Sequence, residues 1–584
     1  MLKILKHLRS KEWLFILASV VLIVGQVWLD LKLPDYMSRV TALLSTGMSR
    51  LSDILLAGAM MLLCALGSLA LSVCVGFFAA QTASRFSRRL RSAVYDKVMS
   101  FGDEEINRFS TASLITRSTN DITNVQMLIA MGLQVIVKAP IMAGMAITKI
   151  STKGIEWTLL TAGVVVFIVI LLAFVMIFAL PRFKKIQWLT DDLNAVTREN
   201  LNGIMVVRAY NAEKYHEEKF DNANNALTTT NLQAHIAMSV MNPGLNLAMN
   251  GLSLGIYWIG AVLIQNTASM AQKVTVFSDM VVFMSYAMQV VMAFLMLVMI
   301  FIMLPRAAVS AKRINEVLDT KPVLKNGNLK KGEDGKKGEI EFKNVSFRYP
   351  GSSEYVIENI SFKANTGDTI AIIGPTGSGK STIINLIPRL YDVSKGEVIV
   401  NGKNVKDYDK RALNDLIGFV PQKAYLFSGT VKSNVGYGMD NISESEIDSA
   451  LKVAQASNFV NVPEVGLDGY VAQTGSNFSG GQKQRLSIAR AVAKRPEILV
   501  FDDSFSALDY RTDKILRTAL KKEAKDATKI IVAQRIGTIT DADLILVIED
   551  GNIVGKGTHK ELLKTCEVYK EIAYSQLSKE ELAV

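Results

Sequence analysis

Long apolar runs alternate with polar stretches in the first part of the chain, up to about residue 304. A helix needs about 20 mostly apolar residues to cross the hydrocarbon core of a bilayer. Six runs are long enough, although glycines and polar residues interrupt the second, third and fifth. The six runs cover residues 13–33, 55–80, 126–148, 157–180, 236–264 and 277–304. The pattern therefore predicts a membrane domain of six helices.

The connections between these runs are of two kinds. Residues 81–125 and 181–235 are long, polar and helical in pattern, whereas residues 149–156 and 265–276 are short. Lysines and arginines beside a membrane span favour its cytoplasmic side. Four of them precede the first run: Lys3, Lys6, Arg9 and Lys11. We therefore expect the N-terminus, the two long connections and the C-terminal half to be cytoplasmic, in a multi-pass protein of the cell membrane.

The composition agrees with a membrane half joined to a soluble half. Of the 584 residues, 49% are hydrophobic, and the formal net charge is +11. The cations flank apolar runs and form no basic patch with interleaved aromatic residues, so topology explains the charge and nucleic-acid binding is unsupported. Residues 13–29 are too long and too apolar for the core of a cleavable signal. The three cysteines lack metal or redox spacing.

The pattern changes after the sixth run. Residues 322–338 are rich in Lys and Gly without an apolar period, which is typical of a linker. Short β-like runs then alternate with helical ones, which predicts an α/β domain with a largely parallel sheet. The expected strands are Ile340–Phe342, Thr369–Ile373, Glu397–Val400, Ile498–Phe501 and Lys529–Ala533. The expected domains are a membrane domain (1–320), a linker (321–339) and an α/β domain (340–580).

A phosphate-binding motif follows one of these strands. Residues 374–381 read GPTGSGKS and match G-x-x-x-x-G-K-[ST], between the strand Thr369–Ile373 and the helical run Thr382–Leu390. Backbone N–H groups of such a loop surround phosphate oxygens, Lys380 reaches the β and γ phosphates, and the helix N-terminus favours the anion. The predicted nucleotide-binding residues are Gly374, Pro375, Thr376, Gly377, Ser378, Gly379, Lys380, Ser381 and Thr382.

A second acid-bearing strand, Ile498–Asp502, lies downstream of this loop. In phosphate-loop folds such an aspartate holds Mg²⁺ together with the Ser/Thr hydroxyl of the loop. An apolar strand that ends in Asp is a weak signal by itself, but its distance from a phosphate loop strengthens it. Ser381 and Asp502 are therefore predicted Mg²⁺ ligands.

These motifs together resemble the ATP-binding-cassette (ABC) family, over essentially the whole chain. The resemblance implies that Gln422 touches Mg²⁺ and senses the membrane domain, and that Tyr349 stacks on adenine. It also implies a signature at Asn477, Phe478, Ser479, Gly480, Gly481 and Gln482, and a D-loop that crosses between paired cassettes at Ser506, Ala507, Leu508 and Asp509.

Two segments of the membrane half carry the same resemblance. Glu199–Tyr210 resembles the cytoplasmic loop of exporters whose helix docks on the cassette, and Asn107–Asp121 resembles the first such loop. A membrane domain N-terminal to the cassette is the exporter arrangement. The implied fold is an α-helical six-span membrane domain of the type I exporter kind, followed by an α/β P-loop nucleotide-binding domain, with ATP and Mg²⁺ as cofactors.

The resemblance also implies a partner. In this family two cassettes sandwich two ATP molecules head to tail, and each site joins the phosphate loop of one cassette to the Ser-Gly-Gly of the other. The site built on Gly374–Ser381 would then use a partner's signature, and Ser479–Gly481 would complete the partner's site. The N-terminus of the signature helix suits the γ-phosphate as an anion.

Two residues depart from the family pattern at the step of hydrolysis. The family places a Glu after the Mg²⁺-linked Asp to handle the attacking water, but Asp503 is one methylene shorter, and proton transfer depends on reach. The family also uses a His that clamps the γ-phosphate, and Gln534 cannot carry its positive charge. A third departure, Gln473, where many exporters have Glu, has no consequence that we can derive.

These departures favour a heterodimer over a symmetric homodimer in which Asp503 is a competent base. The chain would form a degenerate ATP site with its own loop, while a homologous half-transporter with an intact Glu and His hydrolyses ATP at the site that this chain's signature completes. Heterodimeric bacterial multidrug exporters resemble this pattern. The expected activity is therefore ATP-driven efflux by an ABC-type xenobiotic-transporting ATPase.

Residues in the fifth and sixth runs suggest a cargo cavity. Methionine is flexible and polarisable and suits varied apolar shapes, although helix packing explains such a stripe equally well. Three asparagines share one face of the fifth run and should avoid lipid, toward either the cavity or other helices. The candidates are Asn242, Asn246, Asn250, Met284, Met288, Met292, Met296 and Met299.

Few charges lie inside the runs, which suggests lipophilic small molecules as substrates. We expect Lys138 to snorkel toward the interface and Asp35 to be solvated, while Asp30 and Asp279 could form an outer gate or attract cations. Two alternatives stay open: a lipid or peptide exporter of the same fold, and an ATP-gated channel or regulatory subunit, which the lack of a charged pore ring disfavours.

Overall fold

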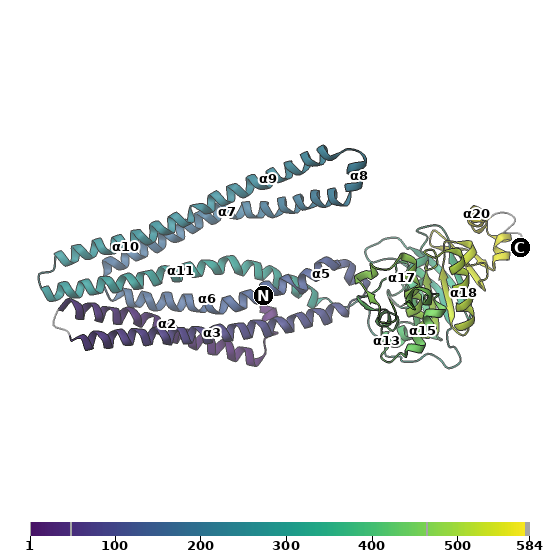
Figure 1. Ribbon diagram of the computed structural model, residues 1–584, viewed down its shortest axis with the longest axis horizontal. Helices are drawn as coiled ribbons and strands as arrows, with labels where there is room; N and C mark the ends of the chain where they lie inside the picture. Colours follow the sequence, from purple (N-terminus) through teal and green to yellow (C-terminus); the bar gives the residue numbers. More distant parts are fainter. Residues whose placement is uncertain (1, 47–49, 463–464, 578–584) are drawn as a thin grey trace. The chain divides into compact units, whose positions relative to one another are not determined.

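The computed structural model describes residues 2–46, 50–462 and 465–577. The chain divides into two compact units (Figure 1). The first comprises Met1–Lys97 and Ala112–Thr320, and the second comprises Val98–Thr111 and Lys321–Val584. Residues 98–111 of the first long polar connection thus belong to the same unit as the predicted nucleotide-binding motifs.

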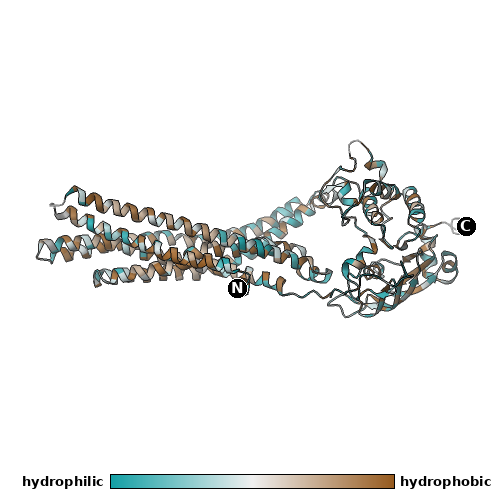
Figure 2. Cartoon of the chain, turned by 90° about the horizontal axis from the view of Figure 1, so that it is seen from below, coloured by the Kyte–Doolittle hydropathy of each residue, from teal (hydrophilic) through white to brown (hydrophobic). Residues whose placement is uncertain are grey.

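The first unit consists of helices. Six helical stretches of the described chain are long and apolar enough to cross a membrane, which confirms the predicted number of spans. Hydrophobic residues follow the long helices (Figure 2). The long helices are α2 (Ser10–Thr46), α3 (Leu51–Met99), α6 (Asn120–Ser151), α7 (Ile155–Asn202), α9 (Glu213–Ser239), α10 (Met241–Gln265) and α11 (Met270–Asp319). The short ones are α1 (Leu2–Leu5), α5 (Thr111–Ser118) and α8 (Ile204–Ala209).

Apolar side chains from α2, α6, α7, α10 and α11 form the core of this unit. Trp157 and Phe283 are both buried, and their ring centroids lie 5.4 Å apart. The indole N–H of Trp157 donates to the carbonyl of Ile256 at 3.2 Å. The apolar part of the Trp157 ring is packed and its N–H group is hydrogen-bonded, so this residue fixes α7 against α10 and α11.

Acids and lysines of the spanning helices form ion pairs, which corrects two expectations. Lys138 does not simply extend to the interface, because its Nζ lies 3.3 Å from a carboxylate oxygen of Asp30. Asp35 is not merely solvated: Lys149 donates to it at 2.8 Å and the buried Tyr286 at 2.5 Å. A third pair joins Lys153 to Asp279 at 2.6 Å. Charges in an apolar surrounding are stable mainly when paired. Asp30 and Asp35 therefore hold α2 against neighbouring helices, and Asp279 holds α11 against the turn after α6.

A six-stranded sheet forms the centre of the second unit. The strand order is β12-β11-β3-β10-β9-β6, and every neighbouring pair except β11 and β12 is parallel. The strands are β3 (Thr369–Ile373), β6 (Ile417–Val420), β9 (Ile498–Asp502), β10 (Thr528–Val532), β11 (Leu544–Glu549) and β12 (Asn552–Gly557). Burial on both faces explains the continuous apolar sequences of the five parallel strands, whereas residues of the edge strand β12 are mostly exposed or half-buried.

A separate antiparallel sheet corrects the expectation of one largely parallel sheet. Its order is β2-β1-β4-β5, so the runs near residues 340 and 398 do not join the parallel sheet. Its strands are β1 (Ile340–Phe347), β2 (Ile357–Ala364), β4 (Lys395–Val400) and β5 (Lys403–Asn404), and β7 (Gly429–Thr430) pairs with β8 (Tyr470–Val471). The alternation of exposed and buried residues in β2 is typical of an antiparallel sheet with one solvated face.

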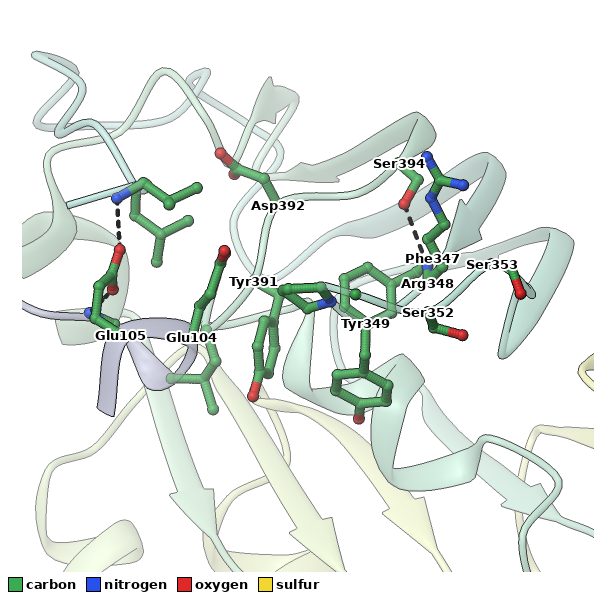
Figure 3. Close-up of a pocket in the computed structure, with 16 residues that line it drawn as sticks. Glu104, Glu105, Phe347, Arg348, Tyr349, Ser352, Ser353, Tyr391, Asp392 and Ser394 are labelled. Carbon is green, nitrogen blue, oxygen red and sulfur yellow. Dashed lines mark hydrogen bonds between the residues drawn. The ribbon is translucent and has the colours of Figure 1, made fainter. Parts of the chain in front are cut away.

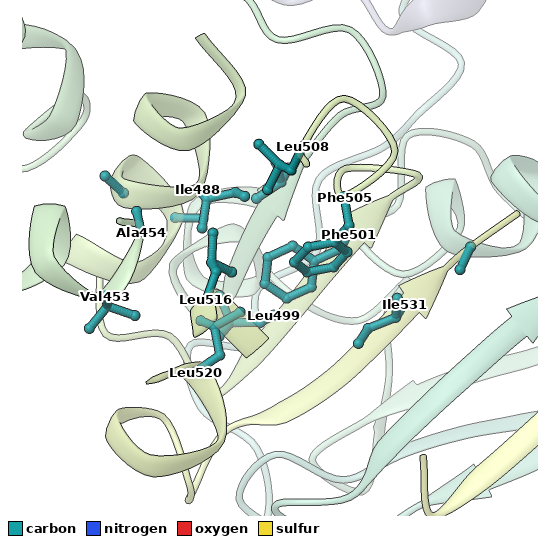
Figure 4. Packing of buried hydrophobic residues seen from close by; sticks show 14 of the residues in the cluster. Val453, Ala454, Ile488, Leu499, Phe501, Phe505, Leu508, Leu516, Leu520 and Ile531 are labelled. Carbon is teal, nitrogen blue, oxygen red and sulfur yellow. The ribbon is translucent and has the colours of Figure 1, made fainter. Parts of the chain in front are cut away.

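Helices cover the parallel sheet, and two apolar clusters fill its faces. Figure 4 shows one of them, in which Phe501 and Phe505 lie with ring centroids 5.1 Å apart. The helices of the second unit are α4 (Asp103–Phe109), α12 (Lys380–Asn385), α13 (Lys410–Asp415), α14 (Val431–Val435), α15 (Glu444–Val453), α16 (Ser457–Val460), α17 (Gly480–Ala493), α18 (Tyr510–Glu523), α19 (His559–Thr565) and α20 (Glu567–Gln576). Two 3₁₀ turns are η1 (Gln473–Gly475) and η2 (Ile536–Thr538).

The segment between α11 and β1 lies along the second unit. Leu329 bridges to Tyr408, and the backbone N–H of Glu333 donates to the carbonyl of Asn401 at 2.8 Å. Backbone hydrogen bonds therefore tie part of this Lys- and Gly-rich segment to the antiparallel sheet.

Candidate nucleotide site

The phosphate loop joins β3 to α12 at the carboxyl edge of the parallel sheet, where ligands of such sheets bind. Gly379 has φ of 93°, and an added Cβ there would lie 2.6 Å from the Ile357 side chain. An added Cβ on Gly374 would lie 1.9 Å from the carbonyl oxygen of Ile548. Only glycine fits at these two positions, and the turn that they permit presents backbone N–H groups to one cavity.

This cavity has a volume of about 250 Å³. It brings together residues from the phosphate loop and α12, from β9 and from the loops after β6 and β10. Its lining residues are Val356, Thr376, Gly377, Gly379, Lys380, Ser381, Thr382, Gln422, Asp502, Asp503, Val532 and Gln534. Gln422 and Gln534 thus lie beside the loop, although each is at least 41 positions beyond its last residue, Ser381, in the sequence.

Lys380 lies within the loop that it is predicted to serve. Its Nζ donates to the carbonyls of Gly374 at 2.9 Å and Pro375 at 2.6 Å. Burial lowers the pKa of this ammonium group, while the nearby Asp503 and Asp502 oppose that change. A phosphate group would supply the negative charge that a half-buried lysine favours.

Ser381 and Asp502 fit a Mg²⁺ ion. The Ser381 hydroxyl donates to a carboxylate oxygen of Asp502 at 2.8 Å, so the two oxygens are close enough for one ion. Mg²⁺ prefers oxygen ligands and takes several of them from substrate phosphates and water, so two protein ligands suffice. Burial raises the pKa of Asp502, and a bound cation would favour its charged form.

Asp503 is held by two glutamine amides. Gln534 donates its Nε2 to Asp503 Oδ2 at 3.0 Å, and Gln422 donates to the same oxygen at 3.4 Å. Asp503 has φ of 45°, a left-handed conformation that Asp adopts more readily than most residues. Burial raises the pKa of this carboxyl. The structure therefore places the two departures from the family pattern in direct hydrogen-bond contact.

A residue that the sequence did not reveal supports this network. Gln576, at the end of α20, donates its Nε2 to the Gln534 carbonyl at 2.7 Å and accepts from the N–H of Ile536 at 2.8 Å. A single side chain thus bridges the loop that carries Gln534. No motif or spacing marks Gln576, because its role depends on how α20 packs near η2.

Tyr349 lies at the other side of α12. Its hydroxyl is 3.1 Å from that of Thr382, and its ring packs against Phe347 and Tyr391. A second cavity of about 580 Å³ flanks these rings, and Figure 3 shows Tyr349 and Tyr391 side by side in its wall. An aromatic ring at this place offers a face on which a base could stack.

Helix α4 forms another wall of this second cavity. Its Glu105 is 3% exposed and accepts from the N–H of Gly102 at 2.8 Å and of Val323 at 2.7 Å (Figure 3). Glu105 therefore fixes the N-terminus of α4 and the chain that follows α11. No motif in the sequence marks this role, since residues 105 and 323 are distant along the chain.

The signature residues lie away from the phosphate cavity. Ser479 caps α17, and its N–H donates to Gln482 Oε1 at 2.9 Å in a reciprocal capping box. Ser479, Gly480 and Asn477 are exposed. Among the described residues, none from 477–482 lines the cavity around Lys380. This chain thus presents its signature outward, as a capped helix N-terminus suited to an anion.

The D-loop connects the two sets of motifs. Ser506 donates its hydroxyl to the Asp503 carbonyl at 2.8 Å, and Asp509 caps α18 by accepting from the N–H of Thr512 at 2.9 Å. Ala507 is exposed and Leu508 is buried. Gln473 is exposed in η1.

The residues predicted to contact cargo differ in their exposure to solvent. Asn242, Asn246 and Asn250 are all exposed on α10. On α11, Met292 is 44% exposed. Three others are half-buried: Met284, Met288 and Met296. Met299 lies outside the residues whose side chains the structure describes. These positions agree with an open polar face on α10 and a mixed face on α11.

The second long polar connection, residues 181–235, carries an exposed apolar surface. Helix α8 lies within the first unit between α7 and α9 (Figure 1). The exposed apolar residues at this tip are Leu201 at 67%, Met205 at 80%, Val206 at 62% and Tyr210 at 80%. So many exposed apolar side chains on a polar loop are typical of an interaction surface.

Comparison with known families accounts for both units. The model of the ABC transporter transmembrane region matches residues 14–294, and the ABC transporter model matches residues 357–506. An uncharacterised ABC transporter ATP-binding protein of Mycobacterium tuberculosis is 41% identical over 88% of this chain and 86% of its own. A second one, from Bacillus subtilis, is 36% identical over 86% of each chain.

Two further proteins extend this comparison. An ATP-dependent lipid A-core flippase of Haemophilus influenzae is 31% identical over 86% of this chain and 84% of its own. The structure of a bacterial Atm1-family ABC exporter with ATP bound is similar with a TM-score of 0.79 at 24% identity, over 97% of this chain and 98% of that one. The fold of an ABC exporter therefore extends over nearly the whole chain.

Proposed function

The chain belongs to the ABC transporter family, and from this premise we propose that it is one half of a heterodimeric exporter of lipophilic compounds. Its cassette faces the cytoplasm, and ATP binding between paired cassettes drives the change in access. Only a difference in the affinity of ATP for the two states can drive such a switch. Hydrolysis takes place mainly at the site that the partner's phosphate loop forms with this chain's signature.

The contact between Asp503 and Gln534 is the observation that carries this proposal. The carboxylate that would polarise water is one methylene short and accepts from a neutral amide 3.0 Å away. A histidine in place of Gln534 could bear a positive charge toward the γ-phosphate, whereas an amide cannot. The site therefore keeps the groups that bind ATP and Mg²⁺ but lacks two that promote hydrolysis.

Two exposed features support a partner. The capped N-terminus of α17 is directed to solvent in the single chain, and its exposed Ser479 suits a γ-phosphate held by another phosphate loop. The apolar residues at the tip of α8 are also not covered by other described residues of the first unit, since Met205 and Tyr210 are each 80% exposed. A second half-transporter would cover both surfaces.

Restoring the hydrolytic groups tests the division of work. We expect the double variant Asp503→Glu and Gln534→His to raise hydrolysis at this site at least about tenfold, within the range for a positioned acid–base group. The measurement is the steady-state ATPase rate of the purified chain together with its partner, with the partner's own catalytic Glu changed to Gln. Either single variant is the matched control, because each restores one group only.

Two results would contradict the proposal. One is brisk ATPase activity and drug transport by this chain in the absence of any second half-transporter. The other is undiminished hydrolysis by the wild-type pair after the partner's Glu→Gln change. In both cases the site built on Lys380 would be competent, and in the first case the chain would work as a symmetric homodimer.

A lipid is the second candidate for the cargo, because a relative that is 31% identical is named a lipid A-core flippase. The exposed asparagines of α10 could bind a polar headgroup while the α11 methionines contact acyl chains. Vesicles that contain the pair separate the candidates. ATP-dependent movement of a labelled lipid, with no accumulation of lipophilic dyes, would favour the lipid.

A further inference from the structure

The second unit contains a basic cavity that no nucleotide motif uses. It has a volume of about 240 Å³ and is lined by β3, β9 and β10, by α18 and by residues 537–542. Phe501, Leu520 and Ile531 form part of its apolar wall and are visible in Figure 4. Four cations and one carboxylate also line it: Lys514, Arg517, Lys521, Lys529 and Asp541.

Lys529 is the unusual member of this set, because it is 6% exposed on a central strand. Its Nζ donates to the carbonyl of Ala527 at 2.8 Å and makes no other hydrogen bond or ion pair with the described residues. An ammonium group has three donors, and buried lysines are almost always paired. Burial lowers the pKa of Lys529, while the carboxylates of Asp543 and Asp526 oppose that change without forming an ion pair with it.

Other polar groups converge on the same cavity. Thr538 is 6% exposed, and within the described chain its hydroxyl has no hydrogen-bond partner. Lys514 and Lys521, seven residues apart on α18, are exposed and form no ion pair with any described residue. Arg517 differs from them, since it pairs with Asp513 at 3.0 Å and donates to the Thr538 carbonyl at 3.1 Å. Arg517 therefore links α18 to the backbone at Thr538. Lys514, Lys521 and Lys529 form no ion pair with the described residues, so their positive charges could interact with an anion.

We propose that this cavity binds a phosphate or pyrophosphate group of a small anionic ligand. Lys529 is the buried anchor, the Thr538 hydroxyl is a second donor, and Lys514 and Lys521 bind at the rim. The oxygens of a phosphate accept hydrogen bonds from several donors at once, which matches these groups. Because α18 begins after Asp509 and η2 follows Gln534, such a ligand would brace two elements that adjoin the nucleotide site. The proposal does not depend on the division of work between two ATP sites.

Binding of radiolabelled pyrophosphate to the full-length chain in detergent tests this site. The parent for the test carries Lys380→Ala and Ser381→Ala, which weaken binding at the phosphate loop. We expect this parent to bind pyrophosphate in equilibrium dialysis and Lys529→Met to lower the affinity at least about tenfold. The pair Lys514→Ala and Lys521→Ala should lower it about threefold. Lys525→Met, an exposed lysine that does not line the cavity, is the matched control and should change nothing.

The fold of Lys529→Met is checked separately with an intact phosphate loop, by binding of a fluorescent ATP analogue at the wild-type level. If this variant does not fold, the change of Lys514 and Lys521 decides, because both lie on the exposed surface of α18. Equal pyrophosphate binding by the parent, Lys529→Met and the double lysine variant would overturn the proposal. A parent that binds no pyrophosphate would overturn it as well.

Discussion

The phosphate loop and the signature of this chain differ in their surroundings. The chain itself surrounds the phosphate loop with the other predicted site residues, whereas it leaves the signature exposed to solvent. Side-chain hydrogen bonds connect the residues around Lys380. Ser381 donates to Asp502, and Asp503 accepts hydrogen bonds from two glutamines. At Ser479 it presents a capped helix N-terminus to solvent. Under the proposed function, the pocket that this chain assembles is the one with weakened chemistry, whereas its signature would bind a nucleotide held by another cassette.

The two long polar connections of the membrane half show the same contrast. The buried Glu105 ties α4 to Val323 within the cassette unit. The tip of α8 instead exposes Met205, Val206 and Tyr210. Parts that the chain completes by itself should therefore tolerate the absence of a partner, and mutations of the exposed parts should matter only in the assembled pair.

The signature offers the largest expected effect. Ser479→Arg removes the N-cap of α17 and places a bulky cation where the γ-phosphate of the partner's site is expected. We expect hydrolysis by the pair to fall about 10²–10³-fold, the range for loss of a group that stabilises transition-state charge. Binding of an ATP analogue to the isolated chain should not change. If Ser479→Arg left the ATPase rate of the pair intact, the signature would not serve the active site.

A charge on the tip of α8 should have the next largest effect. Val206→Asp would place a carboxylate in an apolar contact, and we expect ATP-dependent transport by the pair to fall about tenfold. Val554→Asp, on exposed β12 of the cassette, is the matched control and should have no effect. Transport assays with both variants would compare the two surfaces directly, and equal losses would argue against α8 as a docking element.

Gln576 should have a smaller effect, confined to the pocket that this chain completes. Gln576→Ala removes two hydrogen bonds to the loop of Gln534, each of which is worth about 1 kcal/mol. We expect the affinity of this site for a fluorescent ATP analogue to fall several-fold, about fivefold for each kcal/mol that reaches the site. Gln576→Glu keeps the acceptor for Ile536 and should retain part of the affinity. No change in either variant would remove Gln576 from the site.

The smallest effect is expected at Asp503. Asp503→Asn keeps the size of the side chain and removes its charge, and we expect the ATPase rate of the pair to stay within about twofold of wild type, since hydrolysis occurs at the other site. A loss of 10²-fold or more would show that Asp503 is a working base, and would break the contrast between the two pockets.

Features that depend on local composition and spacing could be predicted from the sequence alone. Six apolar runs of sufficient length predicted six spanning helices. The motif at 374–381 predicted a strand, a glycine-rich turn and a helix, because its glycines and lysine have few other uses. Asp502, Gln422 and Gln534 could be placed near that loop through family resemblance, and the structure brings all three to one cavity. Their catalytic roles stay predictions.

Contacts between residues far apart in the sequence became visible only in the folded structure. It separated β1 and β4 into an antiparallel sheet, paired Lys138 with Asp30, and brought Gln576 to Gln534 and Glu105 to Val323. None of these contacts leaves a periodic signal in the sequence, because each joins residues through packing of elements far apart in the chain. Whether a buried charge such as Lys529 finds a partner likewise depends on which side chains the fold places around it.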